Sequence, residues 1–397
     1  MSTLAAPDTP SVSRLRSIIY VLLVITVVGI TFSIAVSSIA MGTAIGLWLV
    51  ILVMTRFRGF DRTPLDYFFL AYAAAEILAT IFSVSPADSL VNMKRLLLIA
   101  VMYLALTSVD SERKIKIVLV LLAVVTTLLT LFELFSLTKI GEHFVRIALF
   151  QYYITEAEIK MIVMLMLVPV IIHAGTPRYW RTGAIVSEIV LLLGIIVTQT
   201  RSSWLGLIAG VCALAFVRSK KLLIAVVAVV GLFVLFAPSD FKNRASSMFD
   251  PNMTSNLTRI HMIQTGWRMF QDYPIVGTGD IDLKKLYITY ITPIDEGEGG
   301  HLHNNMMMLL VTLGAVGFIA TMAVFVKIFT VELDLIKNTE NHWLFESVAL
   351  GAFACYIAFH VNGLFEWNFG DHEIAVFLWF TIGLAMAAHR LSKATAR

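Results

Sequence analysis

Charged residues and cysteines are scarce in this chain. Of its 397 residues only 14% are charged and two are Cys, whereas 58% are hydrophobic. So little charge excludes an ordinary soluble globular domain. Cys212 and Cys355 both lie in apolar stretches, which argues against disulfide bonds and against a thiolate metal site. The net charge of +3 is too small to suggest a nucleic-acid partner.

Apolar stretches near the length needed to cross a bilayer recur from one end of the chain to the other. They fall roughly at 18–36, 38–55, 67–85, 92–109, 115–136, 158–174, 182–200, 203–217, 222–237, 304–331, 344–363 and 373–389. The pattern predicts an all-α integral membrane protein with about twelve transmembrane helices. Residues 1–13, with Pro7 and Pro10, are predicted to form a disordered cytoplasmic tail. We expect 14–397 to form a single polytopic membrane domain.

The positions of Lys and Arg predict the orientation of these helices, because short cytoplasmic loops collect positive charge. Lys and Arg concentrate in alternate connections, starting with Arg14 and Arg16 and including 56–62, 113–116 and 218–221. Both termini are therefore predicted to be cytoplasmic. The long loop at about 237–303, before the tenth helix, is then outside, which in a Gram-negative cell means the periplasm. We expect a multi-pass protein of the bacterial inner membrane.

This long loop carries its own helical pattern. Apolar residues recur at helical spacing between Asn256 and Gln271, namely Ile260, Ile263, Trp267 and Phe270. They predict an amphipathic helix that lies on the membrane surface and contacts membrane lipids. Arg259 and Arg268 fall on opposite faces of this helix, so they are not expected to share a role. Gly277 and Gly279, which follow it, permit close backbone approach in a turn.

The end of the loop holds a titratable residue at the membrane boundary. His303 and Asn304 precede the tenth helix, and His301 lies two residues earlier. The positive end of the helix dipole disfavours protonation of His303, and a neutral imidazole can accept a proton at neutral pH. His303 is therefore a candidate general base in an active site that faces the periplasm. The alternative is a capping or interfacial histidine, and His301 competes for the same role.

Arginines on the same side of the membrane suggest an anionic ligand. Arg201 lies at the outer end of a predicted helix, where the chain turns back almost at once. Such a residue either extends to a lipid phosphate or binds an anionic ligand. The ligand is favoured because Arg259, and at lower weight Lys94, Arg95 and Arg146, lie on the same side as His303. Several cations near one neutral base suit a phosphate-bearing lipid substrate.

Other polar residues carry less weight. Glu366, Asn368, Asp371 and His372 belong to the last outer loop, which we expect to be solvated. No His, Asp or Glu cluster has metal-ligand spacing, and no phosphate-binding glycine loop or serine nucleophile motif is present. No cofactor is expected from these residues.

The loop and its flanks resemble a known family. The run His303-Asn304, then Asn305 to Leu313, then Gly314-x-x-Gly317 resembles the signature of bacterial O-antigen ligases. The preceding Arg259, Trp267, Pro274 and Gly277-Thr278-Gly279 resemble the large-loop pattern of the O-antigen ligase and O-antigen polymerase superfamily of polytopic glycosyltransferases. Around Arg146 the chain departs from its relatives. We expect Gly314 and Gly317 to let neighbouring helices pack closely beneath the histidine.

The resemblance implies lipopolysaccharide biosynthesis. A polysaccharide would pass from undecaprenyl pyrophosphate, the donor, to a sugar hydroxyl of lipid A-core, the acceptor. His303 would take the proton of that hydroxyl as it attacks the anomeric carbon, which inverts that centre. Arg201 and Arg259 would bind the departing pyrophosphate in place of a metal ion, so the reaction is predicted to be metal-independent.

Three rival functions remain from the sequence. An O-antigen polymerase would use the same donor but extend another lipid-linked chain. A pilin or other lipid-linked-oligosaccharide transferase usually carries extra length after its last helices, whereas few residues follow the last span here. A proton-coupled secondary transporter, from a different class, would place its polar residues near mid-membrane.

Overall fold

The structure is a computed structural model that describes residues 9–136, 139–140, 143–144, 148–218, 220–236, 238–248, 250–292, 299–339 and 342–395. Arg146, one of the predicted site residues, lies outside the described residues, as do residues 1–8 of the predicted tail. The boundary of that tail at residue 13 is wrong. Thr9 caps a helix that begins at Pro10, where proline is well tolerated because its missing N–H would be unpaired in any case.

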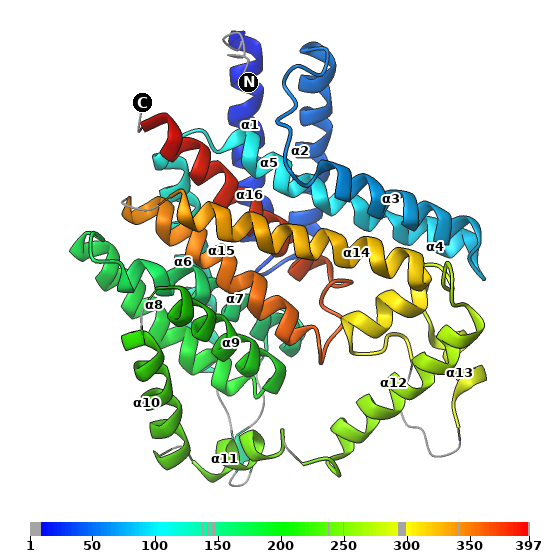
Figure 1. Cartoon of the computed structure of the whole chain (residues 1–397). Helices are drawn as coiled ribbons and strands as arrows, with labels where there is room; N and C mark the ends of the chain where they lie inside the picture. Colours follow the sequence, from blue (N-terminus) through cyan, green and yellow to red (C-terminus); the bar gives the residue numbers. More distant parts are fainter. Residues whose placement is uncertain are drawn as a thin grey trace.

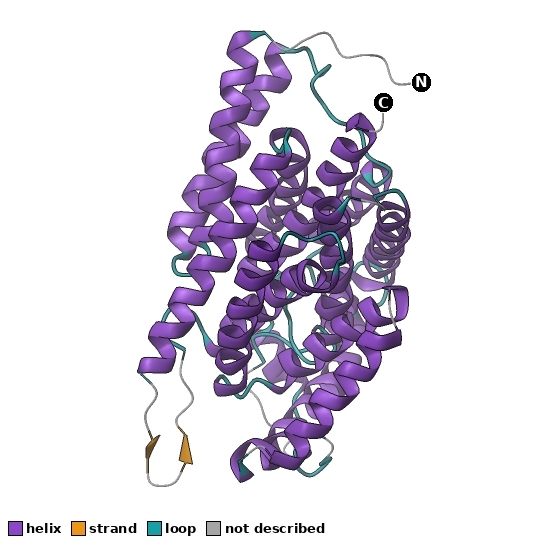
Figure 2. Cartoon of the chain, turned by 90° about the vertical axis from the view of Figure 1, so that its left-hand side faces the viewer, coloured by secondary structure: helices purple, strands orange, loops and turns teal. Residues whose placement is uncertain are grey.

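Every apolar stretch predicted from the sequence contains a helix. The helices before the long loop are α1 (Pro10–Gly29), α2 (Ile34–Met54), α3 (Asp66–Ile81), α4 (Pro86–Asn92), the 3₁₀ helix η1 (Met93–Ile99), α5 (Ala100–Ser108), α6 (Glu112–Phe135), α7 (Tyr153–Ile172), α8 (Arg178–Val197), α9 (Arg201–Arg218) and α10 (Lys220–Phe236). The loop contains α11 (Ser239–Ser246), α12 (Thr254–Asp272) and α13 (Lys284–Tyr290), and α14 (Asn305–Lys337), α15 (Trp343–Asn362) and α16 (His372–Thr395) follow it. Two short strands, β1 (Lys139–Ile140) and β2 (His143–Phe144), pair antiparallel and lie below the helices in Figure 2.

The all-α membrane fold is confirmed, whereas the number of spans is not settled. Within the described ranges, 9 helical segments are long and apolar enough to cross a membrane, and one of them joins α4, η1 and α5. The predicted stretches that fall short do so for visible reasons. Helix α3 has 16 residues and α10 has 17, and α7 carries Glu156, Glu158 and Lys160.

The helices form a bundle with two distinct ends and an apolar outer surface. The start of α1 and the end of α16 lie at one end of the molecule, and α11, α12 and α13 lie at the other (Figure 1). Helices α15 and α16 are the most buried spans. The outer helices instead expose large apolar side chains such as Ile39, Phe135 and Phe216. So much exposed apolar surface is expected where lipid, not water, surrounds a protein.

Helix α12 confirms the helix predicted within the long loop, and it packs on the protein with residues outside the predicted apolar stripe. Its buried residues are Met262, Thr265, Gly266 and Met269. Two residues of the predicted apolar stripe are largely exposed instead, Ile260 at 42% and Trp267 at 49%. The helix therefore has two apolar faces, one on the protein and one directed outward.

Gly314 interrupts α14, and the segment that follows α12 packs against α14 at this point. The backbone of Gly314 has φ 62° and ψ −169°, a conformation that glycine adopts readily and other residues do not. Across this break, the amides of Ala315 and Val316 donate to the carbonyls of Pro274 and Ile275, at 2.9 and 3.1 Å. A Cβ on Gly314 would clash with the Ile275 backbone. The expectation that Gly314 serves helix–helix packing is thus wrong, because a loop backbone occupies that space.

Candidate functional site

Close packing of two helices builds one side of the site. A Cβ on Gly206 or Gly210 of α9 would lie 3.1 or 2.9 Å from the carbonyl oxygens of Ala358 and Ala354 on α15, so only glycine fits this contact. At the site end of the contact, Asn362 Nδ2 donates to Ser203 Oγ at 3.3 Å. This packing places the start of α9 beside the turn that follows α15.

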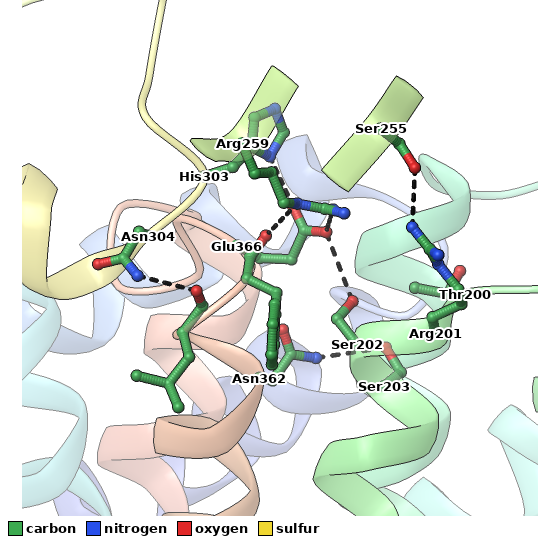
Figure 3. A network of polar contacts seen from close by, with 12 residues as sticks. Thr200, Arg201, Ser202, Ser203, Ser255, Arg259, His303, Asn304, Asn362 and Glu366 are labelled. Carbon is green, nitrogen blue, oxygen red and sulfur yellow. Dashed lines mark hydrogen bonds and ion pairs between the residues drawn. The ribbon is translucent and has the colours of Figure 1, made fainter. Parts of the chain in front are cut away.

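The carboxylate of Glu366 is the centre of the site (Figure 3). Glu366 is only 4% exposed. One of its oxygens, Oε2, lies 2.7 Å from His303 Nδ1, and the other, Oε1, accepts from Arg259 Nη2 at 2.5 Å. Ser202 Oγ on α9 donates to Oε1 at 3.4 Å. One buried carboxylate therefore joins α9, α12 and the segment just before α14.

The contact with Glu366 decides which nitrogen of His303 can act as a base. A carboxylate only accepts hydrogen bonds when ionised, so Nδ1 must carry the proton in this contact. In a neutral imidazole the other nitrogen, Nε2, then holds a free electron pair. His303 has a positive φ of 46°, an uncommon and strained conformation for a non-glycine residue, of the kind found at functional sites.

Asn304, rather than His303, caps α14. Its side-chain oxygen accepts from the amide of Met307 at 2.9 Å, and its Nδ2 donates to the carbonyl of Leu364 at 2.8 Å. Asn304 thus holds the start of α14 against the turn after α15. The alternative interpretation of His303 as a helix cap is wrong.

Arg201 is buried at the start of α9, with 7% exposed. Its Nη1 donates to the carbonyl of Ser247 at 2.6 Å and to Ser247 Oγ at 3.0 Å. Its Nη2 donates to Ser255 Oγ and Asn256 Oδ1, both at 2.8 Å. The guanidinium therefore binds the start of α12, one turn before Arg259, and does not extend toward lipid.

A cleft of about 1000 Å³ opens beside His303 and Glu366. Arg95 and His301 also line it, whereas Arg201, Arg259, Lys94 and Asn304 are not among the residues that line it. Arg259 contacts Glu366, which does line it. The structure thus gathers His303, His301, Arg95, Arg259 and Arg201 at one end of the bundle, with only the first three facing the cleft.

Arg95 is held in place by an acid and an aromatic ring. Its Nη1 donates to both carboxylate oxygens of Asp280, at 2.5 and 2.6 Å, and its guanidinium lies 5.8 Å from the centre of the Trp367 ring. Burial raises the pKa of Asp280, and the charge of Arg95 lowers it. Lys94, the neighbouring residue, is exposed.

His301 lies against His303, with the two ring centres 4.3 Å apart. Burial lowers the pKa of His301, and the neighbouring His303 lowers it further, while Glu366 acts in the opposite direction. His301 is therefore disposed to stay neutral. Among the described residues, the hydrogen bond to Glu366 is made by His303 and not by His301.

Glu366 and Asn368 are functional candidates that the sequence reasoning undervalued. Their loop was expected to be solvated, yet Glu366 is 4% exposed and Asn368 is 2% exposed. They alternate with the apolar residues Phe365, Trp367 and Phe369. A short connection so rich in aromatic residues was the available signal that this loop is buried.

Among the described residues, no group of three or more His, Cys, Asp or Glu side chains could hold a metal ion.

These features define a multi-pass helical membrane protein with a polar site at the end opposite its termini. Residues 186–322 match the family model described as O-antigen ligase, so this part of the chain is similar to that family. The matched region contains Arg201, Arg259, His303 and Gly314. It supports a glycosyltransferase of the O-antigen ligase or polymerase type.

Other comparisons add little. No curated protein is similar enough in sequence to match. Among solved structures, one match is a chain from "Structural coordination of polymerization and crosslinking by a peptidoglycan synthase complex", with 14% identity and a TM-score of 0.45 over 83% of this chain and 97% of that chain. This similarity is too low to support a function.

Proposed function

We propose that this protein is an O-antigen ligase that transfers a polysaccharide from undecaprenyl pyrophosphate to a sugar hydroxyl of lipid A-core. The observation that carries the proposal is the contact of His303 Nδ1 with Glu366 Oε2 beside a large cleft, inside the region that matches the family. The active site would face the periplasm, with both termini in the cytoplasm. The outward apolar face of α12 would contact the membrane surface.

In the proposed reaction, His303 Nε2 removes the proton of the acceptor hydroxyl while its oxygen attacks the anomeric carbon of the donor. The new glycosidic C–O bond forms as the bond from that carbon to the pyrophosphate oxygen breaks. Glu366 holds the histidine in the required tautomer and stabilises the imidazolium that forms, as carboxylates do beside catalytic histidines. No protein-bound intermediate is needed, and the anomeric centre inverts.

The departing pyrophosphate needs positive charge, which we assign to Arg201 and Arg259. Arg201, on α9, donates to Ser255 and Asn256 of α12, and Arg259, on α12, donates to Glu366. Neither is among the residues that line the cleft. Donor binding would therefore exchange part of their present contacts, those of Arg201 with Ser247, Ser255 and Asn256 and that of Arg259 with Glu366, for phosphate oxygens.

Two alternative functions would use the cleft and its residues differently. An O-antigen polymerase would accept a second lipid-linked glycan at the same cleft. A proton-coupled transporter would bind its substrate near mid-membrane, whereas His303, Arg201 and Glu366 all lie at helix ends, at the start of α14, the start of α9 and the end of α15.

The choice of acceptor tests the proposal. Purified protein in vesicles should transfer glycan from undecaprenyl pyrophosphate to lipid A-core and should not lengthen a second lipid-linked glycan supplied instead. Transfer should persist in a chelator, because the cations are side chains. Elongation of lipid-linked glycan with no product on lipid A-core would show a polymerase, and loss of transfer in a chelator would refute the metal-free leaving-group site.

A further inference from the structure

Helix α7 places a buried acid at the floor of the cleft. Glu158 is 1% exposed and lines the cleft. Its Oε2 accepts from Asn368 Nδ2 at 3.2 Å. Its other oxygen, Oε1, has no hydrogen-bond partner in the described part of the chain. An ionisable group in an apolar helix is costly and is retained where it binds something.

Asn368 fixes the orientation of Glu158, and both of its N–H donors are used within the protein. Its Nδ2 also donates to the carbonyl of Phe359 at 3.0 Å, and its Oδ1 accepts from Asn305 Nδ2 at 2.6 Å. The amide therefore holds one carboxylate oxygen of Glu158 and leaves the other directed to the cleft. Simple helix packing would not require this directed contact.

A second carboxylate, that of Asp371, lines the same cleft. Its Oδ2 accepts from Thr155 Oγ1 at 2.8 Å, and its Oδ1 accepts from the amide of Glu373 at 3.0 Å. Thr155 lies one turn before Glu158 on the same face of α7, so the two carboxylates share one side of the cleft. Each carboxylate oxygen has two lone pairs, so Asp371 keeps sites for further donors.

Some of the other residues that line the cleft suit a sugar, whereas Arg95 and Lys284 give it positive charge. Trp367 and Tyr152 line the cleft with aromatic rings, and Asn92 adds an amide. A few polar groups placed among aromatic side chains are the usual make-up of a small-molecule site. Carboxylates repel a pyrophosphate but accept hydrogen bonds from hydroxyl groups. This part of the cleft is therefore complementary to a neutral polyol and not to the leaving group.

We propose that Glu158 and Asp371 form a carbohydrate subsite that binds the acceptor sugar and presents one of its hydroxyls to His303. The proposal rests on the proposed function. It adds the part of the cleft that the acceptor occupies, separate from the arginines assigned to the donor. Both carboxylates act by accepting hydrogen bonds from acceptor hydroxyls that do not react.

The test measures transfer at saturating undecaprenyl-pyrophosphate-linked glycan while lipid A-core is varied. Glu158→Gln and Asp371→Asn should each raise the KM for lipid A-core about ten- to a hundredfold, because each replaces an oxygen that accepts a hydrogen bond with an amide group that cannot. The KM for the donor should stay unchanged. Asp371→Asn keeps one side-chain oxygen that can accept from the amide of Glu373 at the start of α16, and it replaces the other oxygen with an amide group that cannot accept.

Glu332→Gln is the matched control. Glu332 is an equally buried acid on α14 with no hydrogen bond to either oxygen in the described part of the chain, and it does not line the cleft. It should leave the KM for lipid A-core unchanged. If Glu158→Gln fails to fold, Asp371→Asn in the more open part of the cleft decides.

The outcomes separate this proposal from the proposed function. An unchanged KM for lipid A-core in variants that fold would overturn the subsite, and so would an increase in the KM for the donor alone, which would assign these residues to the donor glycan. In either case the wild-type protein would still transfer glycan to lipid A-core. Failure of the proposed function would appear earlier, as absence of that transfer in the wild-type protein.

Discussion

His303→Ala should slow glycan transfer by about a hundred- to ten-thousandfold, the usual contribution of a positioned general base. Donor binding should be largely retained, because His303 contacts Glu366 and not the arginines assigned to the pyrophosphate. Turnover of the purified variant in vesicles, with the amount of lipid-linked glycan that it binds, measures both effects. Without the imidazole no base removes the proton of the acceptor hydroxyl, and a protonated hydroxyl is a poor nucleophile at neutral pH.

His389→Ala is the control for this variant, since His389 lies near the end of α16, at the opposite end of the bundle from the site. It should transfer glycan at the wild-type rate. Wild-type turnover by a folded His303→Ala protein would rule out the role of base. The neighbouring His301 would then be the next candidate, because it lines the same cleft.

Arg201→Ala should weaken donor binding and slow turnover together. The loss in rate should be about a hundred- to a thousandfold, as for removal of one contact to a developing negative charge. Arg259→Ala should act in the same direction and should also disturb His303, because it leaves Glu366 without its arginine partner. Binding of lipid-linked glycan and turnover at saturating donor are measured side by side.

Arg218→Ala provides a matched control on the same helix. Arg218 lies at the other end of α9, where it pairs with Glu346 at 2.9 Å. Its removal should change thermal stability but neither donor binding nor turnover. Because Arg201 also fastens the start of α12, the melting temperature of Arg201→Ala must be measured too. Unchanged donor binding and turnover in both Arg201→Ala and Arg259→Ala would remove the pyrophosphate assignment.

The sequence was sufficient to predict the helices because the bilayer imposes their length and composition. The apolar stretches and the helix at 254–272 follow from patterns that are local in the chain. Gly314 shows where local reasoning stops. Its place in an apolar run suggests a packing contact, but its φ of 62° is required by a loop from elsewhere in the chain.

For the site, too, local features could be predicted and contacts between distant residues could not. His303 and Arg201 are candidates from the sequence because polar residues at the ends of apolar stretches stand out, and Arg259 is a candidate because it lies on the loop helix on the same predicted side. The aromatic residues beside Glu366 indicate that its loop is buried, but its partners depend on α9 and α12 meeting around it. The pairing of Arg95 with Asp280 likewise joins residues far apart in the chain. Such contacts have no signature in a single sequence.

The stereochemistry of the product tests the central claim most directly. If the acceptor hydroxyl, activated by His303, displaces pyrophosphate in one step, the new glycosidic linkage must have the opposite anomeric configuration to the donor. The cleft also holds carboxylates, and a carboxylate that acted first as a nucleophile would give two displacements and net retention. The coupling constant of the anomeric proton, measured by NMR in donor and product, distinguishes these routes. Inversion is predicted, and retention would contradict His303 as the base of a single displacement.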